Sequence, residues 1–350
     1  MIILSIDTSC DDTCIAILKI EKKKIKVLSN IISSQVDIHK KYGGVYPSLA
    51  KREHEKNLVP VLKQALQKAQ NKKKFKKPDL IAVTIGPGLD PCLWVGLNFA
   101  KSLSLVWDIP LVPVNHIEGH IFANFLSKIN LNFQKLLPAI CLIVSGGHTQ
   151  LILIKKIGNY KIIGETRDDA AGECFDKTAR ILGLAYPGGP SIAQEAEKLL
   201  ISDSQIAIKL PRPMIYSKDY DFSFSGLKTA VLYDYKKRSK KIRTSQKYIS
   251  AMAKEIQQTI IDVLIKKTIK AAKDYKIKNI ILGGGVIANK ELQKQFKEKI
   301  KKEIPNSLLL LPDSNLCTDN AAMIGIAGYL NKNKALKDAQ KIKVNSNLRI

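Results

Sequence analysis

Residues 1–31, MIILSIDTSCDDTCIAILKIEKKKIKVLSNI, decide the fold class because they contain three short apolar runs in close succession. The runs cover residues 2–6, 14–20 and 25–31, and polar turns separate them. Short apolar runs bounded by polar turns are typical of buried β-strands. The pattern therefore predicts three strands at the start of the chain.

The same rhythm returns near the middle of the chain. Residues 139–144, 150–156 and 160–164 form a second set of three apolar runs, and helices and further strands follow in both halves. A βββαβα pattern used twice predicts an α/β fold of two lobes with a cleft between them. We expect one lobe over residues 1–135, a second lobe over 136–331 and a C-terminal tail over 332–350.

Apolar spacing and capping signals place the other elements. In the first half they predict helices over residues 47–69, 91–106 and 116–125 and a strand over 80–85. In the second half they predict helices over 173–182, 191–199, 245–275, 289–301 and 319–330, and strands over 279–282 and 307–311.

The composition, 45% hydrophobic and 25% charged over 350 residues, is ordinary for a soluble enzyme. The apolar start has no basic segment, so we expect no secretory signal. The longest uncharged stretch, residues 136–154, has a polar centre, so we expect no membrane span. The six cysteines form no CxxC pair, which favours reduced thiols and a cytoplasmic location.

The charge is strongly positive, since 57 Lys and Arg against 31 Asp and Glu give +26. Such a charge attracts polyanions, and nucleic acid is the leading candidate. Only 7 of the 57 are Arg, so solvated lysine-rich helix faces are the alternative. The densest basic run, residues 236–241, is either a solvated helix end or a contact with an RNA backbone.

Three glycine- or hydroxyl-rich turns are candidate ligand sites. Residues 7–13 (DTSCDDT) and 145–149 (SGGHT) connect strands, and their backbone and hydroxyl groups could surround a phosphate. Residues 283–289 (GGGVIAN) follow a buried strand and open a helix. The last run lacks the GxGxxG order, which disfavours a dinucleotide oxidoreductase. Each turn alone is also consistent with plain turn chemistry.

A pair of histidines gives the sharpest signal. His116 and His120 lie four residues apart, so on a helix they share one face and can bind one metal ion. Glu118 lies two positions from each, unlike the Glu next to the first His of a zinc protease. Asp319 is the expected third ligand, from the other lobe. The alternative is a surface His pair with Asp319 as an ordinary helix cap.

Acidic residues gather at a helix start over residues 168–177 (DDAAGECFDK). Acids in that place are commonly caps and partners of the helix dipole. Asp176, one turn beyond Glu173, could instead accept a hydrogen bond from a ribose.

Taken together, these segments resemble the tRNA N6-adenosine threonylcarbamoyltransferase family, once described as O-sialoglycoprotein endopeptidases. The resemblance runs nearly end to end and rests on these segments: DTSCDDT (7–13), HKKYGGV (39–45), HIEGH (116–120), VSGGHTQ (144–150), DDAAGECFDK (168–177), YPGGP (186–190), DFSFSGLKT (221–229) and GGGVIAN (283–289). It implies the fold of the actin, Hsp70 and sugar-kinase ATPases.

The resemblance also implies a reaction and its residues. The family moves a threonylcarbamoyl group from threonylcarbamoyl-adenylate to N6 of the adenosine beside the anticodon in tRNAs that read codons beginning with adenine, releasing AMP. His116, His120 and Asp319 match its metal ligands. The usual metal of the family is iron, as Fe²⁺, and zinc or magnesium would also be compatible with these ligands. The residues that match its adenylate-binding positions are Ile143, Val144, Ser145, Gly146, Gly147, Asp176, Gly189 and Asn289.

Partners are implied in the same way. Bacterial members need tRNA, an inactive paralogue and a small ATPase, and a separate synthase supplies the adenylate.

An adenine amine is a poor nucleophile, so a general base would help, and Asp11 and Asp12 are our candidates. The competing functions are an ATP phosphotransferase or chaperone-like ATPase, a non-catalytic paralogue that scaffolds a partner enzyme, and the old peptidase activity.

Overall fold

Two compact units make up the computed structural model, which describes residues 1–22, 24–71, 77–126, 133–198 and 207–350. Unit 1 comprises Met1–Lys135 together with Pro312–Ile350, and unit 2 comprises Leu136–Leu311. The expected lobe boundary at residue 331 is therefore wrong. The chain returns to unit 1 after its last strand, and the final residues pack there. Asn345 donates a backbone hydrogen bond to the Ile85 carbonyl at 2.8 Å.

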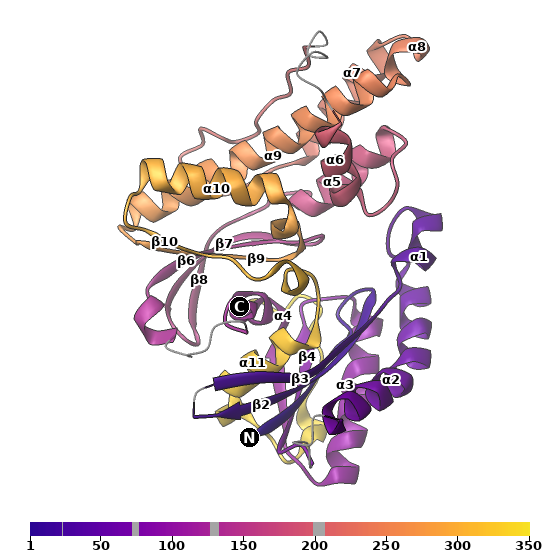
Figure 1. Cartoon of the computed structure of the whole chain (residues 1–350), viewed down its shortest axis with the longest axis vertical. Coiled ribbons are helices and arrows are strands. Elements are labelled where there is room, and N and C mark those ends of the chain that lie inside the picture. The colour runs from indigo at the N-terminus through magenta and orange to yellow at the C-terminus, as the bar shows by residue number, and fades with distance from the viewer. Residues whose placement is uncertain (23, 72–76, 127–132, 199–206) are drawn as a thin grey trace. The chain divides into compact units, whose positions relative to one another are not determined.

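Unit 1 is built on a five-stranded sheet (Figure 1). Its strands are β1 (Ile2–Asp7), β2 (Asp12–Glu21), β3 (Lys24–Ser34), β4 (Leu80–Gly86) and β5 (Leu111–Asn115). Its helices are α1 (Val36–His39), α2 (Pro47–Gln70), α3 (Asp90–Trp107), α4 (His116–Ala123) and α11 (Ala321–Leu330). The sheet order is β3-β2-β1-β4-β5, with β1 antiparallel to β2 and parallel to β4.

Unit 2 repeats this arrangement with its own sheet, in the order β8-β7-β6-β9-β10. Its strands are β6 (Ala139–Val144), β7 (Thr149–Lys156), β8 (Asn159–Glu165), β9 (Asn279–Gly283) and β10 (Leu308–Leu310). Its helices are α5 (Ala171–Ile181), α6 (Gly188–Glu197), α7 (Ser225–Lys237), α8 (Lys240–Arg243), α9 (Gln246–Asp274) and α10 (Lys290–Glu303). The predicted duplication of an α/β lobe is thus confirmed.

Each sheet is buried by helices, which explains the apolar runs of the sequence. β6 has every residue buried, as expected for a central strand covered on both faces. α11 packs against the sheet of unit 1 and is buried over almost its whole length. Among the described residues, every helix is too short or too polar to cross a membrane.

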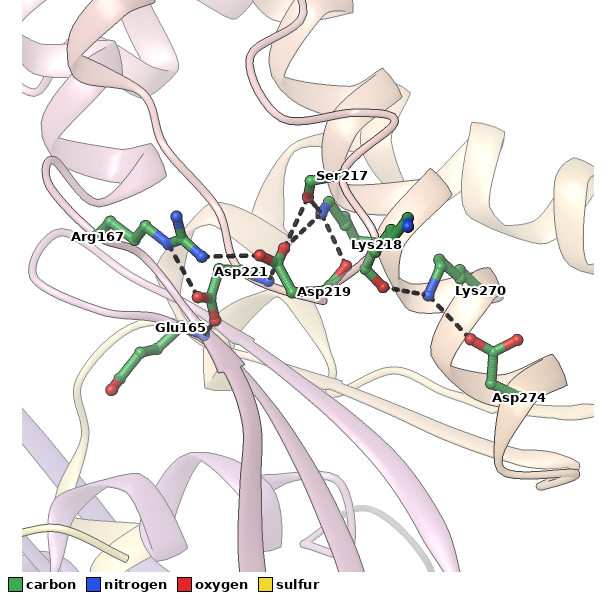
Figure 2. A network of polar contacts seen from close by, with 9 residues as sticks. Glu165, Arg167, Ser217, Lys218, Asp219, Asp221, Lys270 and Asp274 are labelled. Atoms are coloured by element: carbon green, nitrogen blue, oxygen red, sulfur yellow. Dashed lines mark hydrogen bonds and ion pairs between the residues drawn. The ribbon is translucent and has the colours of Figure 1, made fainter.

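A polar network ties the segment before α7 to α9 in unit 2 (Figure 2). Lys267, whose side chain is fully buried, donates to Ser217 Oγ at 2.5 Å and to the Asp219 carbonyl at 3.0 Å. Arg167 binds both Asp219, at 2.7 Å, and Asp221, at 2.9 Å. Burial lowers the pKa of Lys267, and the Asp219 carboxylate opposes that effect. The network fixes the chain just before the segment 221–229.

Replacing Lys267 should destabilise the protein, because Lys267→Met leaves the half-buried Ser217 hydroxyl and the Asp219 carbonyl without this donor. We expect a loss of about 1.5–3 kcal/mol in the free energy of unfolding, measured by urea denaturation. Lys270→Met is the matched control, since Lys270 pairs with Asp274 on the same helix but is partly exposed. The control should cost about 1 kcal/mol or less. Equal losses would contradict this account of the network.

Candidate active site

The two histidines of the HIEGH segment lie at the start of α4. The helix begins at His116 because Asn115 caps it, its Oδ1 accepting the Ile117 N–H at 2.8 Å. The spacing of four residues places both rings on one face, with centroids 4.7 Å apart and planes at 83°. Both rings are buried, which excludes the alternative of a surface pair.

Asp319 brings a carboxylate to this pair from the segment before α11. Its Oδ1 lies 3.4 Å from His116 Nε2 and 3.3 Å from His120 Nε2. Asn320, rather than Asp319, caps α11 by accepting the Met323 N–H at 3.0 Å. The Asp319 carboxylate is therefore not used as a cap. The prediction that Asp319 comes from the other lobe is wrong, because Asp319 and both histidines belong to unit 1.

The three side chains fit a metal ion. One ligand atom from each of His116, His120 and Asp319 lies within 4.8 Å of the others. Both ring nitrogens of His120 are buried without a hydrogen bond among the described residues, and Nε2 has only its 3.3 Å ion-pair contact with Asp319. Buried polar atoms normally have a partner, and a cation bound to Nε2 would supply one. Two imidazoles and a carboxylate are a donor set that several divalent cations accept.

A second carboxylate lies on the other side of His116. Asp7, only 1% exposed, places Oδ2 3.4 Å from His116 Nδ1, while its Oδ1 accepts the Ser9 N–H at 3.1 Å. Burial disfavours a charged imidazole, but Asp319 and Asp7 outweigh burial and raise the pKa of His116 to about 10. Positive charge is therefore strongly favoured at this site.

The two candidate bases lie where the chain turns from β1 into β2, with Asp11 in the loop and Asp12 as the first residue of β2. Burial raises the pKa of Asp11. Burial, with smaller contributions from Asp319 and Asp11, also raises the pKa of Asp12 to about 7. Asp12 Oδ1 is buried without a hydrogen-bond partner among the described residues. A carboxylate with a pKa near 7 is well suited to accept a proton at neutral pH.

A buried histidine that sequence reasoning missed holds this loop. His54, on α2, lies 2.9 Å from the Cys10 carbonyl through Nε2 and 2.7 Å from Thr13 Oγ1 through Nδ1. A carbonyl only accepts, so Nε2 carries the proton and Nδ1 accepts from the Thr13 hydroxyl. Burial lowers the pKa of His54, which keeps the ring neutral. The sequence does contain a signal for this role: His54 is a polar residue on the face of α2 that is otherwise made of buried apolar residues.

In unit 2 five of the candidate adenylate-binding residues, Ile143 to Gly147, lie at or just after the carboxyl end of β6. β6 and β9 are parallel and pair Ile143 with Gly283, so both end at the same edge. Ligands of open α/β sheets bind at the carboxyl ends of strands. A Cβ on Gly146 or Gly147 would meet nothing within 4 Å. The SGGHT turn therefore leaves open space beside its backbone.

Two of the remaining three candidates have structural contacts of their own. Asp176 Oδ1 accepts the Gly188 N–H at 2.6 Å and so holds the turn that carries Gly189. Asn289 caps α10 by accepting the Leu292 N–H at 2.9 Å. Its Nδ2 donates to Gln257 at 2.7 Å. These contacts fix the positions of Asp176 and Asn289 in unit 2.

Comparison with known proteins assigns the chain to a family. The family model described as TsaD, tRNA N6-adenosine threonylcarbamoyltransferase, matches residues 26–326. The chain belongs to the TsaD family. A tRNA N6-adenosine threonylcarbamoyltransferase of Thermosipho melanesiensis is 50% identical over 94% of both chains. The enzyme of the same name from Thermosipho africanus is 47% identical over 100% of both chains. The resemblance noted in the sequence is thus confirmed.

The fold assignment has independent support from a solved structure. Full-length HypF, in its phosphate- and nucleotide-bound form, aligns with 95% of this chain and 55% of its own, with a TM-score of 0.56 at 12% identity. At that identity the likeness concerns the fold alone. It agrees with the actin-like fold that the TsaD resemblance implied.

Proposed function

We propose that this TsaD family member transfers the threonylcarbamoyl group from threonylcarbamoyl-adenylate to N6 of the adenosine beside the anticodon of tRNA, with AMP as the leaving group. The acceptors are tRNAs that read codons beginning with adenine. The observation that carries the proposal is the buried group of His116, His120 and Asp319 in a chain that matches the family almost end to end. The group distinguishes this chain from a scaffold that has lost its metal ligands.

The chemistry asks for positioning and charge stabilisation more than for a covalent nucleophile. The donor is a mixed anhydride, so its carbonyl carbon is already activated. The amine nitrogen forms a bond to that carbon, the bond to the phosphate oxygen breaks, and AMP leaves with the electron pair. The amine must also lose a proton, and Asp11 or Asp12 accepts it in our proposal. Holding the amine in line with the carbonyl accounts for much of the rate.

The metal of this site is Fe²⁺ in our proposal, and Zn²⁺ or Mg²⁺ are the alternatives. His116, His120 and Asp319 would hold it. When bound, such a cation supplies a Lewis acid that polarises a carbonyl or phosphoryl oxygen. Nitrogen ligands favour iron or zinc over magnesium.

The donor is held by unit 2 in this proposal. The backbone of residues 143–147 lies beside the adenylate, with Asp176, Gly189 and Asn289 lining the same site. Support comes from the open space at Gly146 and Gly147, and from the shared sheet edge of β6 and β9.

Asp7 orients His116 in this proposal, because a carboxylate 3.4 Å from Nδ1 favours a proton on that nitrogen and leaves Nε2 for the metal. Asp7→Asn should therefore weaken divalent-metal affinity by about 10- to 100-fold, measured by competition with a metal chelator. Asp37→Asn is a matched control, since Asp37 is an exposed carboxylate on α1 of the same unit. An Asp7→Asn protein that binds metal as tightly as the wild type would contradict this role.

A paralogous partner and a small ATPase complete the proposed assembly, as the family resemblance implies. α3 offers an apolar surface for the paralogue, since Leu105 is 80% and Val106 is 77% exposed. Large apolar side chains exposed as neighbours are typical of protein interfaces.

A reconstituted reaction tests the function. The purified chain, with the two proposed partners, is given threonylcarbamoyl-adenylate and an unmodified tRNA transcript whose anticodon loop carries the target adenosine. Mass spectrometry of the digested tRNA should show threonylcarbamoyladenosine, with AMP released in equal amount. AMP release without modified tRNA would mean that the chain only hydrolyses the donor, and the proposal would be rejected.

A further inference from the structure

The basic run of residues 236–241 forms the tip of a helical arm in unit 2. α7 ends at Lys237, and α8 follows over Lys240–Arg243 before α9 begins. Figure 1 shows this tip at the end of unit 2 away from its sheet. Four of its lysines are exposed, and we call them the lysine tip: Lys236, Lys237, Lys240 and Lys241.

The backbone of the tip is held rigidly by its two arginines. Arg238 makes a two-pronged ion pair with Asp234, with contacts of 3.2 and 3.1 Å. Asp234 also accepts from the Tyr248 hydroxyl at 2.8 Å, and the Tyr248 ring lies in the core. Arg243 stacks over Tyr235 at 5.1 Å. The arginines therefore serve the structure, while the lysines are left to face solvent.

The charge of the lysine tip is not balanced locally. No Asp or Glu occurs between Asp234 and Glu255 in the sequence. Among the described residues, no ion pair involves any of the four lysines. Other helices differ, since Lys51 pairs with Glu55 on α2 and Lys270 with Asp274 on α9. These two lysines each have an acidic partner on their own helix, whereas the four of the lysine tip have none among the described residues.

Hydrogen bonds also connect the helical arm to the residues that bind the threonylcarbamoyl donor in our proposal. At its start, Asp168 accepts hydrogen bonds from the Ser225 N–H and hydroxyl, at 3.2 and 2.6 Å. Close by in sequence, the Gly172 N–H donates to the Ser145 carbonyl at 3.3 Å. The 13 residues of α7 then extend about 20 Å to the tip.

We propose that the lysine tip binds backbone phosphates of the tRNA substrate, at a distance from the adenosine that reacts. The inference rests on the proposed function, because it takes tRNA as the acceptor. Exposed lysines on a rigid support suit phosphate contacts, which position RNA without reading its sequence. The tip contributes affinity for tRNA and leaves the chemical step unchanged.

The test compares two variants with the same loss of charge. In the tip variant, Lys236, Lys237, Lys240 and Lys241 are all changed to Gln. In the control variant, four exposed lysines of α10 in the same unit are changed to Gln: Lys290, Lys294, Lys297 and Lys301. Binding of an unmodified tRNA transcript is measured across a range of salt concentrations, and KM and kcat for transfer are measured in the reconstituted reaction.

The tip variant should bind tRNA about 10- to 100-fold more weakly at low salt, and its log–log salt slope should fall by roughly 2 to 3. Its KM for tRNA should rise while kcat stays unchanged, and the control variant should match the wild type. Equal affinities and slopes for the two variants would overturn the inference. So would a tip variant that keeps its tRNA affinity and loses only binding to phosphatidylserine vesicles.

The two proposals fail in different ways. If the wild type forms no modified tRNA, the proposed function is rejected, and the tip is judged from binding alone. If the wild type forms product while tip and control variants share one KM, only the tip inference is rejected.

Discussion

His116→Ala should lower the rate of threonylcarbamoyl transfer by about 10²- to 10⁴-fold and should abolish binding of one metal ion per chain. The reason is that His116 contributes one of three ligand atoms that lie within 4.8 Å of each other. Loss of a Lewis acid removes several kcal/mol of transition-state stabilisation, at about 1.4 kcal/mol for each factor of ten. Metal content by mass spectrometry and product formation by the purified variant check both parts.

Glu118→Gln is the matched control for this variant. Glu118 lies on the same helix and is also buried, but its Oε2 accepts a hydrogen bond from Asn331 at 3.1 Å. The control should keep its metal and its rate. A His116→Ala protein that keeps full activity with no bound metal would show that the reaction does not need this site.

The double variant Asp11→Asn, Asp12→Asn should lower kcat by about 10²- to 10⁴-fold, the usual contribution of a general base. In the wild type the rate should rise with pH, since only an ionised carboxylate accepts a proton. The midpoint of that rise should lie at or below about 7, the raised pKa of Asp12. A bound cation favours the carboxylate and moves the midpoint down. The double variant should lose the rise.

The pH profile distinguishes a role of Asp11 and Asp12 as general bases from a purely structural role. Binding of tRNA and of the adenylate should be unchanged in the double variant, and its unfolding transition should match that of the wild type. An unchanged kcat, or an unchanged rise of rate with pH, would remove both carboxylates from the mechanism.

The strands of this fold could be predicted because burial makes them apolar. Residues 139–144 are all apolar in sequence and all buried in β6. The division into units could not be predicted in full. α11 is apolar almost throughout, so its sequence marks it as buried without indicating which sheet covers it. Because α11 follows β10 in the chain, the sequence predicts that it belongs to the second lobe, whereas it packs in unit 1.

In the candidate site, too, contacts set by spacing along one helix could be predicted from the sequence, whereas contacts that depend on the tertiary fold could not. The four-residue spacing of His116 and His120 is local, so helical geometry was enough to place both on one face. The approach of Asp7 to His116 joins residues over a hundred positions apart and depends on the pairing of β1, β4 and β5. The contact of His54 with the Cys10 carbonyl likewise depends on the packing of α2.

The most direct test of the account is made in cells depleted of this protein. Their tRNA nucleosides are measured by mass spectrometry after rescue with the wild-type chain, with His116→Ala or with Glu118→Gln, at equal protein levels. We predict that the wild type and Glu118→Gln restore threonylcarbamoyladenosine and that His116→Ala does not. Restoration by His116→Ala would contradict the assignment of the metal site, and failure of the wild-type chain to restore the nucleoside would contradict the function itself.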